Sequence, residues 1–168
     1  MADTVLVVTS LGELAIELDR ARAPVSVENF LRYVDAGHYD GTIFHRVIGT
    51  HMIQGGGYDA AYVKRPVGAP IANEANNGVK NVRGTVAMAR TGEPHSATAQ
   101  FFVNVADCPI FDHQAPTDRG WGYAVFGRVA RGMEVVDAIR AVKTGATGPF
   151  TKDAPLVPVV IHSARRGA

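Results

Sequence analysis

The most constraining feature of the sequence is a series of short apolar stretches, each bounded by Gly, Pro, Asn or Asp. They occur at residues 5–9, 13–18, 43–47, 52–54, 85–89, 101–105, 123–129 and 157–162. Runs of this length between turn-forming residues are typical of β-strands. A parallel sheet would need a helical crossover after most strands, and the sequence has no such regular alternation. The pattern therefore predicts a mainly β fold, a closed eight-stranded antiparallel β-barrel.

Two segments have the spacing of helices instead. The first follows Pro24, with Ser26 as its expected N-cap, and ends at Gly37. The second covers residues 133–142 and ends before Gly145. Each has apolar residues three and four positions apart, so each is expected to bury one face. We expect these two α-helices to cap the ends of the barrel.

Length and composition indicate one globular domain over residues 1–168. Apolar residues make up 46% of the chain and charged residues 20%, close to the values of ordinary folded proteins. With 17 basic and 16 acidic side chains, the net charge of +1 is too small to attract nucleic acid by bulk electrostatics. No apolar segment approaches the roughly 20 residues that span a bilayer. We therefore expect a monomer with no nucleic-acid partner and no membrane association.

Cysteine usage and the N-terminal sequence predict the compartment. Cys108 is the only cysteine, so an internal disulfide is excluded, and a buried, inert thiol is the expected state. The first apolar run is about five residues long, lacks a basic leader and is soon broken by Ser10 and Gly12. The chain is therefore expected to be cytoplasmic.

The densest group of chemically versatile side chains lies in residues 44–57, with the sequence FHRVIGTHMIQGGG. If this segment is a strand, Phe44 and Arg46 share a face, because side chains alternate along a strand. Met52 and Gln54 are likewise same-face neighbours, and they combine an adaptable apolar surface with an amide. Placing a charged guanidinium beside apolar side chains costs free energy, so an arginine on such a face is expected to have a function. The segment is therefore a candidate site.

A second candidate segment, residues 88–104, reads MARTGEPHSATAQFFVN. Gln100 and Phe102 fall on one strand face, which again places an amide beside an aromatic ring. Ala89 and Arg90 precede a loop of small residues, where free backbone groups could pair with an extended peptide. Tyr123, farther along the chain, adds an amphipathic ring near the start of another strand. Together these residues form a second candidate site.

These segments resemble the signature blocks of the cyclophilins. The resemblance extends from the opening hairpin through NFLRYVDAGHYDGTIFHRVI and IANEANNGVKNVRGTVAMAR to VFGRVARGMEVVDAI, and so covers nearly the whole chain. It is greatest for the compact bacterial cytoplasmic form. It implies an eight-stranded barrel with two capping helices and a groove on the outer wall. The implied activity is peptidyl-prolyl cis/trans isomerisation, without a cofactor, which assists protein folding.

The resemblance also implies residue roles. Arg46 is the expected catalytic residue. The expected substrate-binding residues are Phe44, His51, Met52, Gln54, Ala89, Arg90, Gln100, Phe102, Phe111 and Tyr123. The implied partners are proline-containing peptides and unfolded or partly folded proteins. His51 stands where the family usually has phenylalanine, Ile110 where many members have tryptophan, and Tyr123 where many have histidine. Because cyclosporin-sensitive members typically carry that tryptophan, only weak binding of cyclosporin is expected.

Arginine suits this reaction because rotation about the X-Pro bond makes the prolyl nitrogen pyramidal and gives it a lone pair. A fixed guanidinium directed at that nitrogen then stabilises the transition state more than the planar ground state. The alternative function is a non-catalytic chaperone or scaffold that holds proline-containing segments on the same barrel. A hydrolase is disfavoured because no nucleophile and base can be paired. The six histidines lack the spacing of a zinc site, so no metal is expected.

Overall fold

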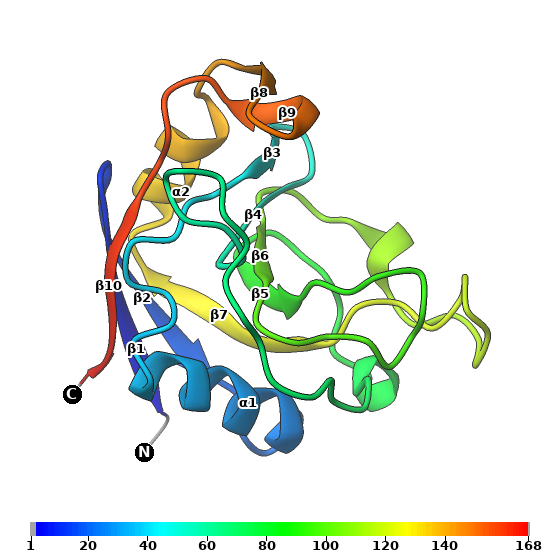
Figure 1. The fold of residues 1–168 in the computed structure, drawn as a ribbon. Helices are drawn as coiled ribbons and strands as arrows, with labels where there is room; N and C mark the ends of the chain where they lie inside the picture. The colour runs from blue at the N-terminus through cyan, green and yellow to red at the C-terminus, as the bar shows by residue number, and fades with distance from the viewer. Residues whose placement is uncertain (1–2, 168) are drawn as a thin grey trace.

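The computed structural model describes residues 3–167 and has a mainly β fold with two α-helices (Figure 1). Eight strands form one antiparallel sheet in the order β10-β1-β2-β7-β5-β6-β4-β3. Their bounds are β1 (Thr4–Thr9), β2 (Gly12–Leu18), β3 (Arg46–Ile48), β4 (Met52–Gly55), β5 (Thr85–Met88), β6 (Phe101–Asn104), β7 (Val125–Arg131) and β10 (Ile161–Gly167). The sequence therefore predicted the strand-rich class and most strand positions correctly.

The sheet is a curled, open half-barrel, so the expectation of a closed barrel is wrong. Its edge strands, β10 and β3, do not pair with each other. Within residues 3–167 an isolated bridge between Ile43 and Val160 spans the seam, with hydrogen bonds from Phe44 N to Val159 O (3.0 Å), from Ile161 N to Thr42 O (2.7 Å) and from Gly41 N to Ile161 O (2.7 Å). Pro158 next to this seam has no N–H to donate. The very short β3 also leaves little backbone for a continuous ladder.

A separate two-stranded hairpin, β8 (Thr144–Thr147) and β9 (Phe150–Pro155), follows the second helix. Figure 1 shows it next to β3, at the end of the molecule opposite the first helix. Its sequence is rich in Gly, Thr and Ala and lacks an apolar run, so the strand pattern did not reveal it. The hairpin is the main element that the sequence failed to predict.

The first helix, α1 (Pro24–Asp35), begins two residues before the expected N-cap. Pro24 fits the first turn because its missing N–H has no partner there in any case. Ser26 lies inside that turn, and both its N–H (2.7 Å) and its hydroxyl (2.8 Å) donate to Oε1 of Glu74. The prediction that Ser26 caps this helix is therefore wrong. A carboxylate from a distant loop accepts the free N–H groups instead.

The second helix, α2 (Met133–Arg140), is slightly shorter than the expected residues 133–142. Two 3-10 turns, η1 (Ala75–Asn77) and η2 (Pro109–Phe111), lie in the long loops. Both helices pack on the main hydrophobic core through buried side chains, including Phe30 of α1 and Ile139 of α2. That core fills one face of the curled sheet.

A second, smaller apolar cluster lies on the opposite face of the sheet. Its buried members are Met52, Ala87, Ala89, Phe102 and Val125. Their immediate chain neighbours, such as Phe101 and Phe126, belong to the main core, because side chains alternate between the faces of a sheet. The outer face is therefore apolar at one place, where strands β4, β5, β6 and β7 lie side by side.

Candidate functional site

Strand register aligns the central residues of the site. Arg46 of β3 pairs with Gln54 of β4, Gln54 with Phe102 of β6, and Phe102 with Ala87 of β5. Directly paired residues in an antiparallel sheet project from the same face. This row therefore places a guanidinium, an amide and an aromatic ring next to one another, although the chain between Arg46 and Phe102 is long. Met52 lies on the same face of β4, two residues before Gln54.

Three aromatic rings form the wall of the site. The ring centroids of Phe102 and Phe111 are 5.4 Å apart, those of Phe102 and Tyr123 5.5 Å, and those of Phe111 and Tyr123 5.3 Å. All three pairs are edge-to-face, the arrangement that aromatic quadrupoles favour. Phe102 is buried, whereas Phe111 and Tyr123 are partly exposed. The rings therefore offer a rigid apolar surface to a ligand.

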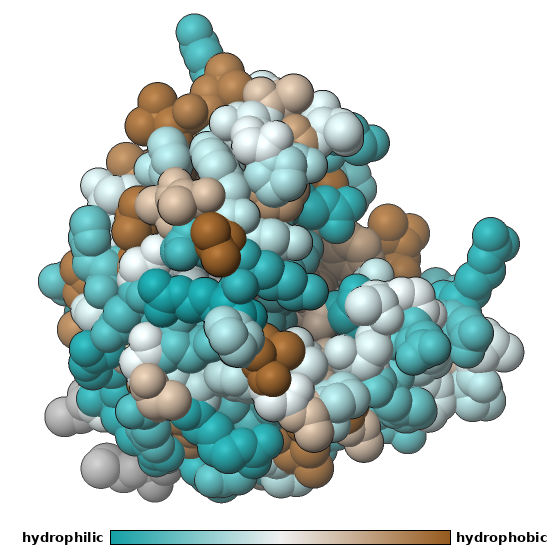
Figure 2. Space-filling model, in the orientation of Figure 1, coloured by the Kyte–Doolittle hydropathy of each residue, from teal (hydrophilic) through white to brown (hydrophobic). Residues whose placement is uncertain are grey.

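These residues enclose a pocket of about 300 Å³. Its lining residues are Arg46, Ile48, His51, Met52, Gln54, Ala89, Arg90, Phe102, Ile110, Phe111 and Tyr123. Figure 2 shows a hollow on this side of the molecule, between its main body and the lobe that carries η2, with apolar surface on its walls. The pocket is large enough for a small apolar ring and its flanking backbone. We call it the aromatic pocket.

Arg46 and Arg90 both line the aromatic pocket but differ in what they contact. Arg90 is held in place, because its Nε donates to Gly122 O (2.9 Å), its Nη1 donates to Thr91 O (2.9 Å), and its Cζ lies 4.7 Å from the centroid of the Tyr123 ring. Arg46 is exposed and belongs to none of the ion pairs among residues 3–167. Its guanidinium is therefore available to a ligand.

Gln54 and Gln100 form an amide pair at the edge of the aromatic pocket. Nε2 of Gln54 donates to Oε1 of Gln100 over 2.9 Å, which leaves the other amide groups for a ligand. Gln100 does not line the aromatic pocket itself. It lines an adjoining pocket of about 160 Å³, which shares Gln54, Ala89 and Arg90 with the first.

Phe44 is the one expected site residue that the structure places elsewhere. It is only 1% exposed, and its ring packs against Phe101 in the main core at a centroid distance of 6.1 Å. The expected alternation fails because β3 begins only at Arg46, and the backbone before it bonds across the seam to Val159. The expectation that Phe44 shares a face with Arg46 is therefore wrong.

The structure adds Ile48 and Ile110 to the lining of the aromatic pocket. Ile48 follows Arg46 by two residues in the same strand, and strand alternation places the two side chains on one face. Ile110 lies in η2 and is 66% exposed. No periodic pattern identifies a residue in such a turn.

His45 faces away from the aromatic pocket. It is 6% exposed and packs against the rings of Tyr58 (4.8 Å between centroids) and Phe150 (5.3 Å). Its Nδ1 has no hydrogen-bond partner among the described residues. Burial, together with the nearby charge of Arg46, lowers the pKa of His45 to about 4. His45 is therefore a neutral packing residue near pH 7.

The remaining chemical groups have ordinary surroundings. Cys108 is buried, and burial, followed by the charge of Asp107, raises the pKa of its thiol. Within residues 3–167 no group of three or more His, Cys, Asp or Glu side chains is arranged to hold a metal ion. No helix in the described part of the chain is both long enough and apolar enough to cross a membrane.

An outer sheet face with an apolar pocket, a free arginine and half-buried amides has the features of a site that could bind an extended peptide. A family model, the cyclophilin type peptidyl-prolyl cis-trans isomerases, matches residues 4–166. The chain therefore belongs to the cyclophilin family.

Named relatives agree with this assignment. Peptidyl-prolyl cis-trans isomerase cyp18 of Streptomyces antibioticus is 57% identical over 162 residues, which cover 96% of this chain and 97% of the relative. Peptidyl-prolyl cis-trans isomerase B of Escherichia coli strain K12 is 50% identical, with 92% and 94% covered. The chain is thus a peptidyl-prolyl cis-trans isomerase. Identity at this level over the full length favours the enzyme over the alternative of a non-catalytic scaffold.

Solved structures support the fold. A cyclophilin type isomerase of Cryptosporidium parvum matches with a TM-score of 0.79 at 23% identity, covering 100% of this chain and 99% of the other. A second structure of that protein, determined in the presence of the dipeptide Ala-Pro, has a TM-score of 0.78, also at 23% identity, and covers 98% and 99%. At such low identity these matches establish the shared architecture.

Proposed function

We propose that the aromatic pocket holds the proline ring of the substrate and that Arg46 is the catalytic residue. The observation that carries this proposal is the position of Arg46, whose free guanidinium lies on the rim of an apolar pocket. Gln54, its direct neighbour across the sheet, adds amide groups beside it. A ring bound against Phe102 would therefore have its nitrogen near a strong hydrogen-bond donor.

The chemistry requires only this donor and a fixed ring. Amide resonance gives the X-Pro bond a rotation barrier of about 18–20 kcal/mol. Twisting the bond removes the resonance and leaves a lone pair on the prolyl nitrogen, to which Arg46 can donate. A donor aimed at a charge that develops only in the transition state lowers the barrier. Reducing the barrier by about 6 kcal/mol would accelerate rotation more than ten-thousand-fold. No covalent intermediate is involved.

Met52, Phe102, Phe111 and His51 would contact the proline ring, while Tyr123 and Arg90 would form the outer wall. The peptide backbone would lie along Ala89 and Arg90, just beyond the end of β5 and past the last hydrogen bond of this ladder, from Ala89 N to Gln100 O (3.0 Å). An extended peptide can continue such a ladder through its own backbone groups. Gln54 and Gln100 would bind the flanking carbonyl and N–H groups. Under this proposal the ring is fixed while the preceding carbonyl rotates.

The substrates we propose are exposed X-Pro segments of unfolded or partly folded proteins. The pocket opens onto the surface, which suits chains of many sequences. Weak cyclosporin binding is proposed because the exposed Ile110 offers no donor at the rim, unlike a tryptophan. We also propose that residues 1–168 act as a monomeric single domain in the reducing cytoplasm, where a protein with only one, buried cysteine needs no disulfide.

Nuclear magnetic resonance can test the placement of the substrate. In a titration with a blocked Ala-Pro tetrapeptide, the side-chain resonances of Met52, Phe102 and Tyr123 should shift, and cis and trans peptide signals should exchange. The matched peptide with Ala in place of Pro should shift them far less. Equal shifts for both peptides, or shifts confined to another face, would remove the aromatic pocket from its proposed role.

A further inference from the structure

The pocket that adjoins the aromatic pocket has an unusual balance of charge. We call it the cationic pocket. Its lining residues are Gln54, Gly57, Lys64, Arg65, Val67, Ala89, Arg90, Thr91, Ser96, Thr98 and Gln100. Three of these carry a positive charge, three carry a hydroxyl group, and none carries a carboxylate. Because it shares three residues with the aromatic pocket, one extended peptide can reach both.

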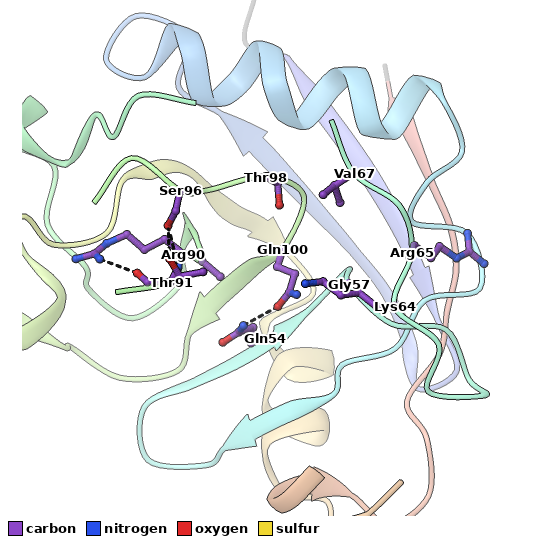
Figure 3. Close-up of a pocket in the computed structure, with 11 residues that line it drawn as sticks. Gln54, Gly57, Lys64, Arg65, Val67, Arg90, Thr91, Ser96, Thr98 and Gln100 are labelled. Carbon is purple, nitrogen blue, oxygen red and sulfur yellow. Dashed lines mark hydrogen bonds between the residues drawn. The ribbon is translucent and has the colours of Figure 1, made fainter. Parts of the chain in front are cut away.

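Only one of the three cations is directed into the cationic pocket. Arg65 donates from Nη1 to His38 O over 3.0 Å, and Figure 3 shows its guanidinium pointing away. Arg90 is held on the far side by Gly122 and Thr91. The Lys64 side chain, in contrast, points from its loop toward the amide of Gln100 (Figure 3).

The ammonium group of Lys64 has no carboxylate partner among residues 3–167, since none of the ion pairs found there includes it. An ammonium beside amides and hydroxyls, without a counter-ion of its own, attracts an anionic group. The residues that line the cationic pocket thus include no carboxylate, which is the group that would complement the Lys64 ammonium.

The backbone under Lys64 is well fixed. Tyr58 and Lys64 form a β-bridge, and Arg65 N donates to Gly57 O over 2.9 Å. Inside this turn, Oδ1 of Asp59 accepts hydrogen bonds from Ala61 N (2.9 Å) and Val63 N (3.1 Å). A side chain on such a turn loses less entropy on binding than one on a loose loop, which favours affinity.

Gly57 leaves room beside Lys64. A Cβ at this position would collide with the side-chain amide of Gln100. Because glycine has no Cβ, Gln100 can lie over it, between its partner Gln54 and the Lys64 ammonium. The donors of Gln100 and Lys64 therefore lie on the same wall of the cationic pocket.

We propose that the cationic pocket binds an acidic side chain close to the proline of the substrate, and that Lys64 determines this preference. The inference rests on the proposed function, because it requires the proline ring to occupy the aromatic pocket. It adds a substrate class: X-Pro segments with a flanking glutamate or aspartate. Lys64 is a specificity-determining residue and takes no part in the bond rotation.

The test compares blocked peptides that contain one Ala-Pro bond and one flanking residue, either Glu or its uncharged isostere Gln. The flanking residue is placed in turn two and one positions before the proline and one position after it. Exchange spectroscopy then gives kcat/KM for each peptide. We expect Glu to exceed Gln about twofold to fivefold at one of these positions, the upper part of the range of an exposed ion pair. The advantage should shrink between 0.02 and 0.5 M NaCl, because salt screens exposed charges.

Variants assign the effect to Lys64. Lys64→Met retains the length of the side chain without its charge and should bring the Glu/Gln ratio to about one, and Lys64→Glu should reverse it. Lys152→Met, an exposed lysine outside both pockets, is the matched control and should leave the ratio unchanged. A ratio near one in the wild type at every position, or an unchanged ratio in Lys64→Met, overturns the proposal.

Two further arms complete the test. A peptide with phosphoserine at the same position distinguishes the anion: if phosphoserine exceeds Glu, the assignment to acidic residues is wrong. Arg46→Ala distinguishes this inference from the proposed function, because that variant should slow the Glu and Gln peptides equally and leave their ratio intact. A Glu/Gln ratio of about one in Arg46→Ala would contradict a separate role for Lys64.

Discussion

At the scale of single residues, the site depends on which polar groups are already engaged and which are free. The guanidinium of Arg90 donates to three backbone carbonyl groups and lies over Tyr123, so it acts as part of a wall. The guanidinium of Arg46 lines the same pocket but has no ion-pair partner among residues 3–167. Identical side chains thus serve different purposes, and only hydrogen-bond partners distinguish them.

This difference leads to a prediction at Gln54. Because Gln54 is paired directly with Arg46 across the sheet, Gln54→Glu would place a carboxylate opposite the guanidinium. The resulting ion pair would occupy the donors that the transition state needs. We expect kcat/KM on an Ala-Pro peptide to fall at least tenfold, with a smaller loss in Gln54→Ala. If Gln54→Glu is as active as Gln54→Ala, Arg46 does not need to be free.

Strand alternation explains how far the sequence could predict the site. It correctly placed Met52 with Gln54, and Gln100 with Phe102, because each pair lies in or next to a regular strand. It failed at Phe44, where the chain has left the ladder and two consecutive residues, Phe44 and His45, are both buried. The pairing of Gln54 with Gln100 depends on how β4 and β6 meet, which no local pattern encodes.

At the scale of elements, the β8–β9 hairpin packs beside β3, the strand that carries Arg46. Phe150 of β9 covers the His45 ring, and Tyr58 completes the cluster at 5.0 Å from Phe150. The segment has hardly any apolar periodicity, so its strands form through contacts with the rest of the fold. The helices, in contrast, were predicted from their apolar spacing, although the carboxylate of Glu74 determines the start of α1.

The buried His45 predicts a pH dependence of stability. Its pKa is about 4 in the folded protein, whereas in the unfolded chain it returns to about 6.5. Between these values the unfolded state binds more protons, so the free energy of unfolding decreases as the pH falls from 6.5 toward 4. The loss should reach about 3 kcal/mol at pH 4.

Urea unfolding at pH 7 and pH 4 measures this loss. His45→Phe, which keeps a ring beside Tyr58 and Phe150 but cannot be protonated, should lose about 3 kcal/mol less than the wild type over the same range. Aspartates whose pKa is lowered by arginine partners, such as Asp40, add a loss that both proteins share. Equal losses in the two proteins would show that His45 is not the group responsible.

At the scale of the whole molecule, the curled sheet brings together residues from distant parts of the chain. Its first strand, β1, pairs with both β2 and the last strand, β10. The sequence indicated the number and direction of these strands. It could not show that the sheet stays open, because closure depends on a seam of few hydrogen bonds beside Pro158 rather than on strand count.

The seam gives a stability prediction. Ile161 begins β10, is fully buried, and its backbone bonds to both Thr42 and Gly41. Ile161→Ala should lower the free energy of unfolding by about 2–5 kcal/mol, the usual cost of emptying such a core position. Val157→Ala, four residues earlier but 79% exposed, should change it by less than about 0.5 kcal/mol. Similar values for both variants in urea titrations would contradict this description of the seam.

The role of Arg46 is tested most directly by the isomerisation rate of an Ala-Pro tetrapeptide with Arg46→Ala. We expect at least a tenfold loss of kcat/KM, with the circular dichroism spectrum and the urea midpoint of the wild type, because Arg46 is exposed and supports no core packing. Arg46→Lys should recover only part of the activity, since an ammonium lacks the planar donor fork. A folded Arg46→Ala variant with near-wild-type kcat/KM would contradict it.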